Sequence, residues 1–405
     1  REVLTMKGAT RAVLSVSKYI YRDGEAVPMT DEDRERIREL NEQYSDEALR
    51  VLAIAHRPLE PSGEDYTMEE VEKDVVFLGL VGMIDPAREG VKEAVEECHE
   101  AQINTYMVTG DHATTARAIA REIGLAHEGE TCPVITGEEL GDIGDEELVD
   151  TMRQHDSLIF SRVDPSDKLR VVKLLEDEMD QVVAVTGDGV NDAPALKRAH
   201  IGVAMGRTGT DVAKEAAEVV LLDDSFPTLV HAVEEGRTIY DNIAKVVLAS
   251  LTTNTAELMA VLLGLIGIAI DNIAIPILAI QILAIDLLAE IMPLTFLCFD
   301  PPGPELMKRA PRERGKHILD TRTGGEVAFL GVLIGGLAVG NFMLYMARHG
   351  LSLQMADVGT VEYMRASTMT WLTIGYCQFV NILSRRYHYT SIFNRNILTN
   401  RILFG

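Results

Sequence analysis

The spacing of apolar and polar residues divides this 405-residue chain near its middle. Before about Leu222, short apolar runs that suit β-strands alternate with stretches that suit helices. Such alternation is typical of an α/β domain built on a parallel sheet, whose ligands bind beyond the carboxyl ends of the strands. The predicted strands and helices are, in order, Ile103–Val108, Ala113–Ile123, Leu158–Phe160, Lys168–Glu176, Val182–Val185, Ala193–Arg198 and Ile201–Ala204.

The first 74 residues have a more mixed pattern, which indicates part of a separate α+β domain. Ala12–Val16 is a β-like run, and Leu52–Arg57 is an apolar run of strand length. Between them a charged segment follows Thr30, a residue type that caps helix N-termini. Another strand-length run, Val75–Val81, is predicted to open the α/β domain, which extends over residues 75–225.

Beyond Asn242 the chain contains apolar stretches near the ~20 residues that a helix needs to cross a bilayer. We predict an α-helical transmembrane domain over residues 246–405, reached through a stalk helix over 226–245. The fourth span is short and polar for its class, and residues 397–405 look like the start of a further span. The predicted spans are 246–270, 273–299, 327–347 and 367–384.

The charge of the loops predicts an orientation in the membrane. The loop Lys308–Lys316 and the tail from Arg385 to Arg401 are basic, whereas the other connections are short or mixed in charge. Basic loops lie on the cytoplasmic side. An even number of spans separates each basic segment from the α/β domain. We therefore expect a multi-pass protein of the cell membrane, with the lipid bilayer as a partner and the α/β domain in the cytoplasm.

Composition agrees with a chain that meets two solvents. The net charge is -25 and the pI about 4.8, yet 47% of the residues are hydrophobic. The acidic surplus lies mostly before residue 240 and argues against nucleic acid as a partner. The four cysteines form no ligand-spaced pair, so neither a disulfide framework nor a zinc site is predicted. They are Cys98, Cys132, Cys298 and Cys377.

The clearest chemical signal is the turn that follows the apolar run Val182–Val185. It reads Thr-Gly-Asp-Gly-Val-Asn-Asp and places Asp188 and Asp192 beside two glycines. Mg²⁺ sites use one or two carboxylates together with phosphate oxygens and waters, and glycines let backbone N–H groups approach an anion. A second Thr-Gly-Asp turn begins at Thr109, again after a predicted strand. The two turns are predicted to converge on one Mg²⁺-phosphate site.

The first two predicted spans contain polar residues at helical spacing. Asn254 and Glu257 are three residues apart, and Asp286 and Glu290 are four apart, so each pair shares a helix face. A charge at mid-bilayer costs ~2.5–3.5 kcal/mol on insertion scales, which favours a bound cation as the compensation. The alternative to a cation site is a structural role, in which Glu257 or Glu290 reaches the polar interface of the membrane or stays protonated.

Five segments resemble motifs of the P-type ATPases, ion pumps built on a haloacid-dehalogenase-like (Rossmann-like) phosphorylation domain. The turn around Asp188 is similar to the family's hinge signature, and Met107–Asp111 to its second phosphate-binding loop. Arg162–Lys168 resembles the segment whose lysine contacts the aspartyl phosphate. The remaining two are Asp85–Arg88, similar to the family's DPxR element, and Lys7–Ala9, similar to the KGA of its nucleotide-binding domain.

The resemblance implies a role for each of these residues. Thr109 and Gly110, followed by Asp111, would form the loop that binds phosphoryl oxygens. Lys168 would neutralise the transferring phosphoryl group and Asn191 would donate a hydrogen bond to it. Asp188 would hold Mg²⁺ while Asp192 supports that loop. The residues implied in ATP binding are Lys7, Gly8, Arg57 and Arg88.

The same resemblance extends to the predicted cation site, which is similar to that of the calcium and sodium/potassium pumps. Asp286 matches the sodium/potassium type, because calcium pumps of the sarcoplasmic-reticulum type carry asparagine there. Ala289 departs from the usual threonine of both types, and Gly375 stands where that calcium pump has a glutamate. Transport of Ca²⁺ is our first expectation, with a Na⁺/K⁺ or H⁺ pump as the alternative.

Two other classes of protein explain fewer of these features. A soluble haloacid-dehalogenase-like phosphatase would lack the spans, and a channel or non-catalytic membrane subunit would have no use for the phosphate-site loops. The family's Asp-Lys-Thr-Gly-Thr segment, which carries the nucleophilic aspartate, does not occur in the sequence. We therefore expect the chain to be a portion of a pump, and we expect this portion not to turn over ATP by itself. The sequence does not indicate whether the pump has an auxiliary subunit.

Overall fold

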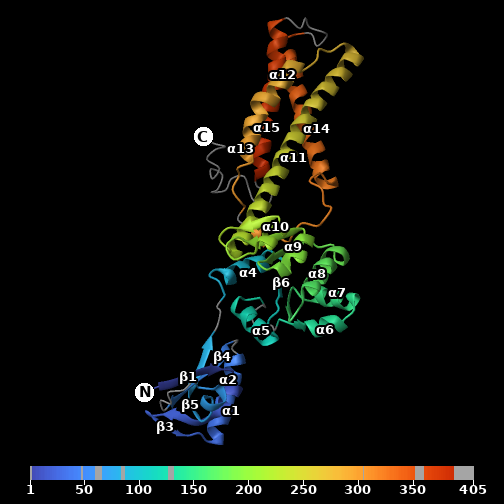
Figure 1. Ribbon diagram of the computed structural model, residues 1–405. Coiled ribbons are helices and arrows are strands. Elements are labelled where there is room, and N and C mark those ends of the chain that lie inside the picture. Colours follow the sequence, from blue (N-terminus) through green and yellow to red (C-terminus); the bar gives the residue numbers. More distant parts are fainter. Residues whose placement is uncertain are drawn as a thin grey trace. The chain divides into compact units, whose positions relative to one another are not determined.

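The computed structural model describes residues 2–46, 49–59, 66–83, 87–125, 132–303, 305–351 and 360–386. The chain forms two compact units, Arg1–Val230 and His231–Gly405 (Figure 1). The boundary between them falls within a single long helix, α11 (Phe226–Asp271).

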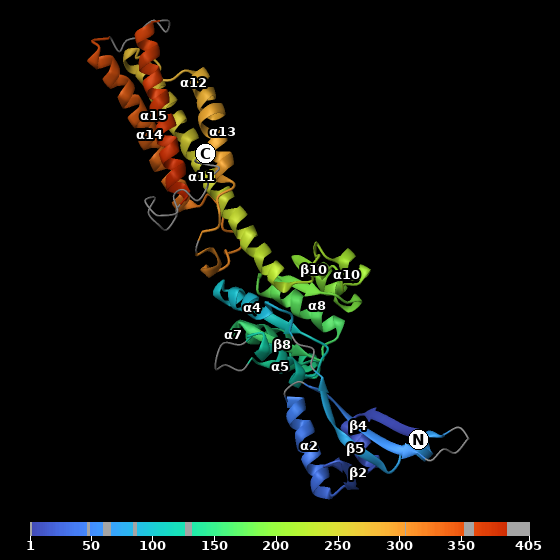
Figure 2. The ribbon, with the colours of Figure 1, turned by 90° about the vertical axis from the view of Figure 1, so that its left-hand side faces the viewer.

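The N-terminal part of the first unit contains a five-stranded sheet with the order β1-β4-β5-β2-β3 (Figure 2). Val13 and Leu14 of α1 pack against Phe77 of β5 in its core. The strands are β1 (Glu2–Gly8), β2 (Ser17–Arg22), β3 (Glu25–Pro28), β4 (Arg50–Leu59) and β5 (Val75–Met83). The helices are α1 (Thr10–Val16), α2 (Asp31–Asp46) and α3 (Met68–Val71).

Two predictions for this region differ from the structure. Ala12–Val16 lies in the helix α1, where Val13 and Leu14 bury one helical face, so the β-like composition of this short run was misleading. The run that begins at Val75 forms β5, between β4 and β2 of the N-terminal sheet. It does not open the following domain, because a short apolar run does not specify which sheet it joins. The helix expected after Thr30 is confirmed as α2.

The rest of the first unit has the predicted alternation of strands and helices. Its strands form two three-stranded sheets, with the orders β6-β8-β7 and β11-β10-β9, in which every pairing is parallel. The strands are β6 (Thr105–Val108), β7 (Val134–Thr136), β8 (Ser157–Ser161), β9 (Ala184–Gly187), β10 (Ile201–Met205) and β11 (Val219–Leu221). The helices are α4 (Val91–Glu100), α5 (Ala113–Glu122), α6 (Gly137–Asp142), α7 (Asp145–Gln154), α8 (Pro165–Lys173), α9 (Ala193–Arg198) and α10 (Asp211–Ala216).

Helix α8 connects the cores of these two sheets. Its Val171 packs in the cluster that contains Phe160 of β8. The next residue, Val172, packs instead with Val183 and Ala195, beside β9. Consecutive residues on a helix point about 100° apart, so one helix can bury two faces against two sheets. The position of α8 therefore relates the loop after β6 to the loop after β9.

The second unit consists of α11 and the helices that pack beside it. The 46 residues of α11 are continuous, which confirms the continuous helix predicted from residue 226 into the first span. The other helical elements are α12 (Ala279–Ala284), the π-helix η3 (Ile285–Glu290), α13 (Ile291–Leu297), α14 (Thr321–Arg348) and α15 (Val361–Arg386). Helices α14 and α15 lie side by side (Figure 1).

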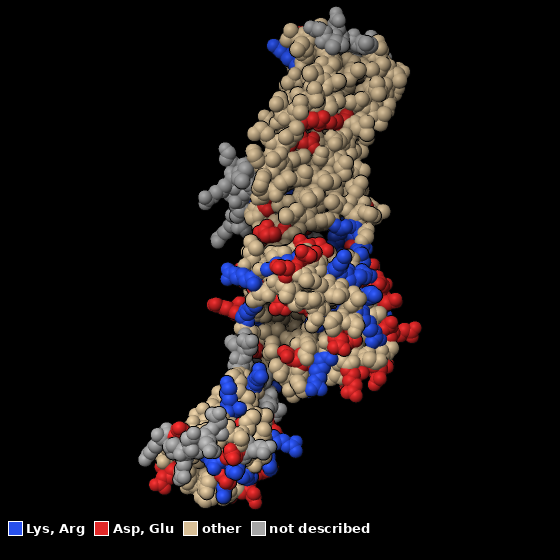
Figure 3. Space-filling view, in the orientation of Figure 1, with Lys and Arg blue, Asp and Glu red and all other residues tan. Residues whose placement is uncertain are grey.

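Three helices of the described residues are long and apolar enough to cross a membrane: Phe226–Ile270, Ala279–Leu297 and Thr321–Arg348. The second of these begins six residues later than predicted, because the segment before it contains Pro276, which packs against Gly264 of α11. Acidic and basic side chains gather over the first unit, whereas the visible surface of the helices carries few (Figure 3).

The fourth predicted span, residues 367–384, forms most of α15 but is not among these three apolar helices. Its polar side chains explain the difference, since Thr370, Gln378 and Asn381 are buried while Phe379 and Val380 are exposed. A helix with this distribution turns its polar face toward its neighbours. That α15 crosses the membrane stays a prediction, and the further span from residue 397 lies outside the described residues.

Helices α11 and α14 approach closely at glycines. A methyl group at Gly335 would lie 2.6 Å from the carbonyl oxygen of Ala256 and 2.8 Å from Cβ of Met259. We expect Gly335→Ala to destabilise the bundle by about 1–3 kcal/mol through overpacking. Gly340→Ala is the matched control, because nothing lies within 4 Å of its added carbon. Thermal denaturation midpoints in detergent test this, and equal midpoints for the two variants would contradict the packing described.

Candidate functional site

The first loop of the site, residues 109–111, follows β6 and is held by the chain that follows β8. The backbone N–H of Thr109 donates to the carbonyl oxygen of Phe160 (2.8 Å), and the N–H of Val163 donates to that of Thr109 (3.3 Å). Arg162 donates its N–H to the carbonyl of Asp111 (3.0 Å). Within the loop, the Thr109 hydroxyl accepts from the Asp111 N–H (3.1 Å). The loop after β6 and the loop after β8 therefore lie together, at the carboxyl ends of two paired strands.

Lys168 reaches from α8 to the turn after β9. Asp164 begins α8 in a capping box with Asp167, which fixes the start of the helix one turn before Lys168. The Lys168 ammonium donates to Oδ1 of Asp192 (2.7 Å), and both side chains are largely buried. The structure thus brings together two residues that the sequence separates by 24 positions.

The second carboxylate oxygen of Asp192 holds its own turn. Oδ2 accepts from the backbone N–H groups of Gly189 (3.0 Å) and Asp188 (3.3 Å). Gly187 is required beside it, because an added Cβ would lie 2.6 Å from Cβ of Asp192. Asp192 therefore ties the lysine, the turn and the end of β9 into one arrangement.

These contacts also determine the charge state of Asp192. Partial burial raises the pKa of its carboxyl, but the hydrogen bond from Lys168 and those from Gly189 and Asp188 outweigh burial and hold the pKa below its ordinary value. Asp192 is therefore ionised at neutral pH and pairs with the lysine as a carboxylate.

Asp188 differs from Asp192 in that its side chain is exposed. Its backbone carbonyl accepts from the N–H of Thr210 (2.9 Å), which fixes the main chain while the carboxylate points away from the core. Asn191 is also exposed, in the short helix η2 (Val190–Asp192). One exposed carboxylate beside a glycine-containing turn fits Mg²⁺, which takes its other ligands from phosphate and water. Among the described residues, no three His, Cys, Asp or Glu side chains gather as a metal cluster.

A third loop, beside the turn after β9, was not predicted from the sequence. Residues 206–210 follow β10, and Thr210 both caps α10 and supports Asp188. Asp224 anchors this loop, accepting from the N–H groups of Arg207 (2.8 Å) and Thr208 (2.9 Å) and from the Thr208 hydroxyl (2.9 Å). The donor from Arg207 and then those from Thr208 lower the pKa of Asp224 to about 2. The glycines at 206 and 209 were the available signal.

The residues predicted to bind nucleotide are only partly brought together. Lys7 and Gly8 end β1, opposite Ile54 and Ala53 of β4. Arg57 lies four positions along β4, opposite Leu4. Its guanidinium donates to the backbone carbonyl oxygens that follow and end α3, those of Glu70 (2.9 Å), Val71 (3.3 Å) and Lys73 (2.9 Å).

Two other arginines bear on this prediction. Arg50 is exposed at the end of β4 that is nearer to Gly8, and the sequence reasoning missed it because the pairing of β1 with β4 was unknown. Arg88 donates to the backbone carbonyl of Asp224. The first two residues of its motif, at 85 and 86, lie outside the described residues.

In the second unit, the two predicted glutamates are buried and Asp286 is half-buried. Glu257 of α11 and Glu290 of η3 are each 5% exposed. Asp286 and Glu290 lie close enough to Glu257 to act on its charge. Asn254 is exposed and does not join them in this structure. It lies one turn before Glu257, and a three-residue step leaves a helix face by about 60°.

Three of these buried carboxyl oxygens stand out in the described part of the chain. Oε1 of Glu257 and both carboxyl oxygens of Glu290 have no hydrogen-bond partner among the described residues. They also lie beside a π-helix, a distortion that is frequent at functional sites. Because unsatisfied polar groups are costly in an apolar environment, the arrangement suits a bound cation.

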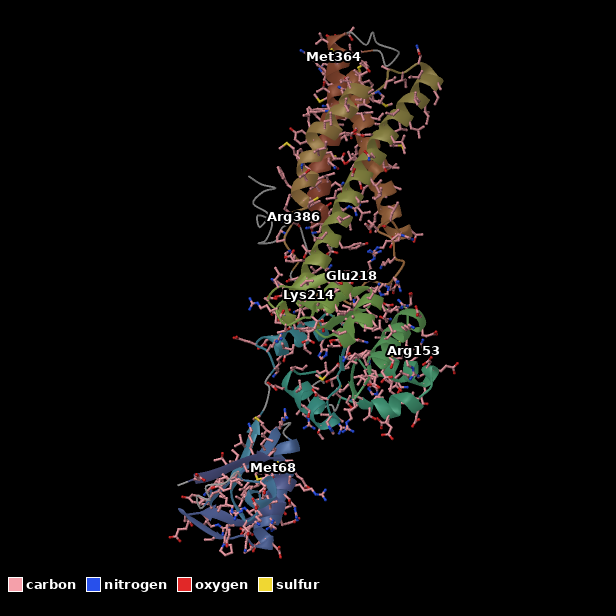
Figure 4. The ribbon with its side chains drawn as sticks, in the orientation of Figure 1. Met68, Arg153, Lys214, Glu218, Met364 and Arg386 are labelled. Atoms are coloured by element: carbon pink, nitrogen blue, oxygen red, sulfur yellow. The ribbon has the colours of Figure 1, made fainter. Side chains whose placement is uncertain are left out.

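A further cluster of charges lies where α15 ends at Arg386, at the opposite end of this helix from Met364 (Figure 4). Buried Asp300 accepts from Arg386 (2.7 Å) and pairs with Lys245 of α11 (3.3 Å). Nearby, Arg237 of α11 donates to the backbone carbonyls of Leu306 (3.1 Å) and Arg309 (2.9 Å). The basic loop is therefore attached to α11, a role that its charge alone did not reveal.

These features define a class of protein: an α/β domain with parallel sheets and acidic, glycine-containing turns after its strands, followed by apolar helices that bury carboxyl groups. Comparison with protein families agrees. Residues 1–90 match the family described as "P-type ATPase, cytoplasmic domain N" and residues 167–230 that of haloacid dehalogenase-like hydrolases. Residues 274–405 match "Cation transporting ATPase, C-terminus". The chain belongs to the P-type cation-transporting ATPases.

Similar proteins include two named as calcium-transporting ATPases. The Calcium-transporting ATPase of Bacillus subtilis (strain 168) is 38% identical over 100% of this chain and 43% of its own length. Calcium-transporting ATPase 1 of Bacillus cereus is 38% identical over 98% and 44%. Cation-transporting ATPase pma1 of Synechocystis is 40% identical over 78% and 34%. This chain thus spans less than half the length of each.

The ion pair between Lys168 and Asp192 predicts a dependence of stability on pH. The folded-state pKa of Asp192 lies below its unfolded value of about 3.9, so the pair stabilises above that pH and is lost as the pH falls through the folded pKa. We expect Asp192→Asn to cost about 1–3 kcal/mol at pH 7, with a smaller difference from wild type below pH 4. Urea unfolding of both proteins across this range measures it. A difference that does not change with pH would contradict the assignment.

Proposed function

We propose that the full-length protein containing this chain is an ATP-driven cation pump that forms an aspartyl-phosphate intermediate and transports Ca²⁺. The observation that carries the proposal is the presence of two sites on one chain, linked by a single continuous helix. The first unit holds the Lys168–Asp192 pair beside its acidic turn, and the second holds buried carboxyl oxygens with no hydrogen-bond partner among the residues described. The names of the similar proteins from the two Bacillus species support Ca²⁺ as the cation.

The residues of the phosphate-site edge act by charge and position. Thr109, Gly110 and Asp111 form the loop that accommodates the phosphoryl oxygens, while Lys168 neutralises charge that develops on the transferring group. Asp192 keeps the Lys168 ammonium in place through their 2.7 Å contact. Asn191, exposed beside them, donates a hydrogen bond to the phosphoryl group.

Asp188 is the proposed Mg²⁺ ligand of this edge. Its exposed carboxylate fits that role, and the hydrogen bond from Thr210 keeps the main chain in position. When bound, Mg²⁺ supplies positive charge next to the phosphoryl oxygens. The residues of this chain then need only hold the reacting groups in line.

For the nucleotide, we retain Lys7 and Gly8 and replace Arg57 with Arg50. Arg57 uses its guanidinium to hold three backbone carbonyls and lies further from Gly8. Arg50 is exposed on the same strand, at the end nearer to Gly8. Arg88 donates to the backbone carbonyl of Asp224 and so holds the segment that leads into α11. We therefore assign Arg88 a positioning role.

The cation site is formed by Glu257, Asp286 and Glu290, which lie on two neighbouring helical segments. Three carboxyl groups suit a divalent cation, and an aspartate at 286 also suits a monovalent one. The nucleophilic aspartate of the family is not part of the sequence, so we expect turnover only from the full-length protein. We place that protein in the cell membrane, with its α/β domain in the cytoplasm.

Loss of the lysine tests the phosphate site. We expect Lys168→Ala to slow phosphorylation of the full-length protein from ATP by about 10²–10³-fold, because one electrostatic donor to the transition state is removed. Lys173→Ala is the matched control, since Lys173 is an exposed lysine of the same helix. Quench-flow measurement of the acid-stable phosphoenzyme gives the rate. A variant that phosphorylates within threefold of wild type would exclude this role for Lys168.

Neutralising the buried glutamates tests the cation site. In Glu257→Gln and Glu290→Gln, we expect Ca²⁺ stimulation of ATP hydrolysis to be lost, because the carboxylate charge that compensates the cation is gone. Glu362→Gln, at an exposed position of α15, serves as the control. The assay compares Ca²⁺, Na⁺ and K⁺ separately in proteoliposomes. Normal Ca²⁺ stimulation in both variants would rule out the site, and stimulation by Na⁺ or K⁺ alone would identify a monovalent-cation pump.

A further inference from the structure

Helices α8 and α9 pack against each other and carry the two members of the ion pair at the proposed phosphate site (Figure 1). Lys168 lies near the start of α8, and Asp192 is the N-cap residue of α9. Their 2.7 Å contact therefore joins the two helices at one end.

A second ion pair joins the same two helices at their other ends. Glu176 lies in the π-helix η1 (Leu174–Glu178), which continues α8, and Arg198 is the last residue of α9. Nη1 of Arg198 donates to Oε2 of Glu176, while Nη2 donates to both carboxylate oxygens of Asp177 (2.7 and 2.9 Å). The guanidinium is thus held between two consecutive acidic residues of η1.

His200 completes this cluster and shows where it lies. Its Nδ1 is 2.7 Å from Oε1 of Glu176 and 3.4 Å from the backbone nitrogen of Val183. Val183 immediately precedes β9, whereas Asp192 lies in the turn that follows β9. The two ion pairs therefore hold α8 and α9 together at opposite ends of this strand, and only one of the pairs lies at the phosphate site.

Glu176 differs from its charged neighbours because it is buried. Its side chain is 3% exposed, whereas those of Arg198 and Asp177 are 37% and 58% exposed. An exposed ion pair contributes little to stability, but removal of one partner from a buried carboxylate is strongly unfavourable. The contact between Glu176 and Arg198 is therefore the one that restrains the helices, and Asp177 adds a surface contact to it.

Between the two ion pairs, the helices meet through small apolar side chains. Val172 of α8 packs with Ala195 of α9 and with Ala199, which follows that helix. Apolar burial is non-directional, so it holds the helices together without fixing how far one is shifted or turned along the other. Charge-assisted hydrogen bonds are directional, and two of them at separate points do fix that position.

We infer that Glu176 is a positioning residue for phosphoryl transfer, which holds α8 on α9 so that the Lys168 ammonium stays at Asp192. The inference rests on the proposed function of Lys168. Glu176 lies eight residues beyond Lys168 on one continuous helical segment, so a shift of its end moves the lysine as well. A misplacement of about 1 Å far from the chemistry can lower a rate by ~10²-fold. Glu176 also lies in a π-helix, a rare distortion that is frequent at functional sites.

The test is a double-mutant cycle on the full-length protein. Glu176→Gln keeps the shape of the side chain and removes its charge, so we expect it to slow phosphorylation from ATP by about tenfold, less than the ~10²-fold of a 1 Å misplacement. In a Lys168→Ala background, we expect the same substitution to change the rate less than twofold, because the residue through which it acts is gone. Glu178→Gln is the matched control, since Glu178 is an exposed glutamate of the same π-helix.

Two outcomes of this cycle would overturn the inference. One is an unchanged rate for Glu176→Gln in the wild-type background. The other is slowing by the same factor in both backgrounds, which is the result of a merely structural role. Glu176→Met combined with Arg198→Met replaces Glu176→Gln if that variant does not fold, because removal of both partners leaves no buried charge unpaired.

A second measurement follows the lysine itself and requires no turnover. The contact with Asp192 protects the Lys168 ammonium from acetic anhydride, so we expect Glu176→Gln to raise its rate of acetylation severalfold. Lys173, exposed on the same helix, is the internal control and should react equally in both proteins. Peptide mass spectrometry measures both lysines in one sample. Equal acetylation of Lys168 in wild type and variant would contradict the inference. If wild-type protein forms no phosphoenzyme, the proposed function fails, while acetylation still decides whether Glu176 positions Lys168.

Discussion

The second unit depends on one constraint: a carboxyl group placed among apolar helices must be compensated. Glu257 and Glu290 are each only 5% exposed, yet three of their carboxyl oxygens have no hydrogen-bond partner within the described part of the chain. The neighbouring structure is consistent with that constraint. A π-helix carries Asp286 and Glu290 on one segment, glycines let α14 approach α11, and α15 turns its amides inward.

In the proposed phosphate site, by contrast, a carboxylate is compensated by hydrogen bonds from the protein itself. Asp192 receives hydrogen bonds from the Lys168 ammonium and from two backbone N–H groups, so its charge is fully compensated and its turn is rigid. Asp188, four residues earlier, keeps its carboxylate exposed. Within one turn, one aspartate therefore maintains the structure and the other is available to a ligand.

The sequence predicted the elements better than their contacts. The alternation before Leu222 and the continuous helix from Phe226 are local properties of composition and periodicity, and the structure has both. The prediction of which sheet contains Val75 was wrong, because the pairing of distant strands is not visible in the local sequence. Arg57 was predicted to bind nucleotide, but its guanidinium instead holds three backbone carbonyls at the end of α3.

Helix α11 runs for 46 residues with no interruption; it begins in the first unit and contains Glu257 of the second. At 1.5 Å per residue, Glu257 lies about 46 Å from the start of the helix. A helix with an unbroken hydrogen-bond ladder resists twisting as well as bending. A rotation of the whole helix about its axis would carry Glu257 with it, and about 100° of rotation would bring the next side chain to the same place. Which residues of α11 face the buried layer is therefore set by the rotational position of the helix as a whole.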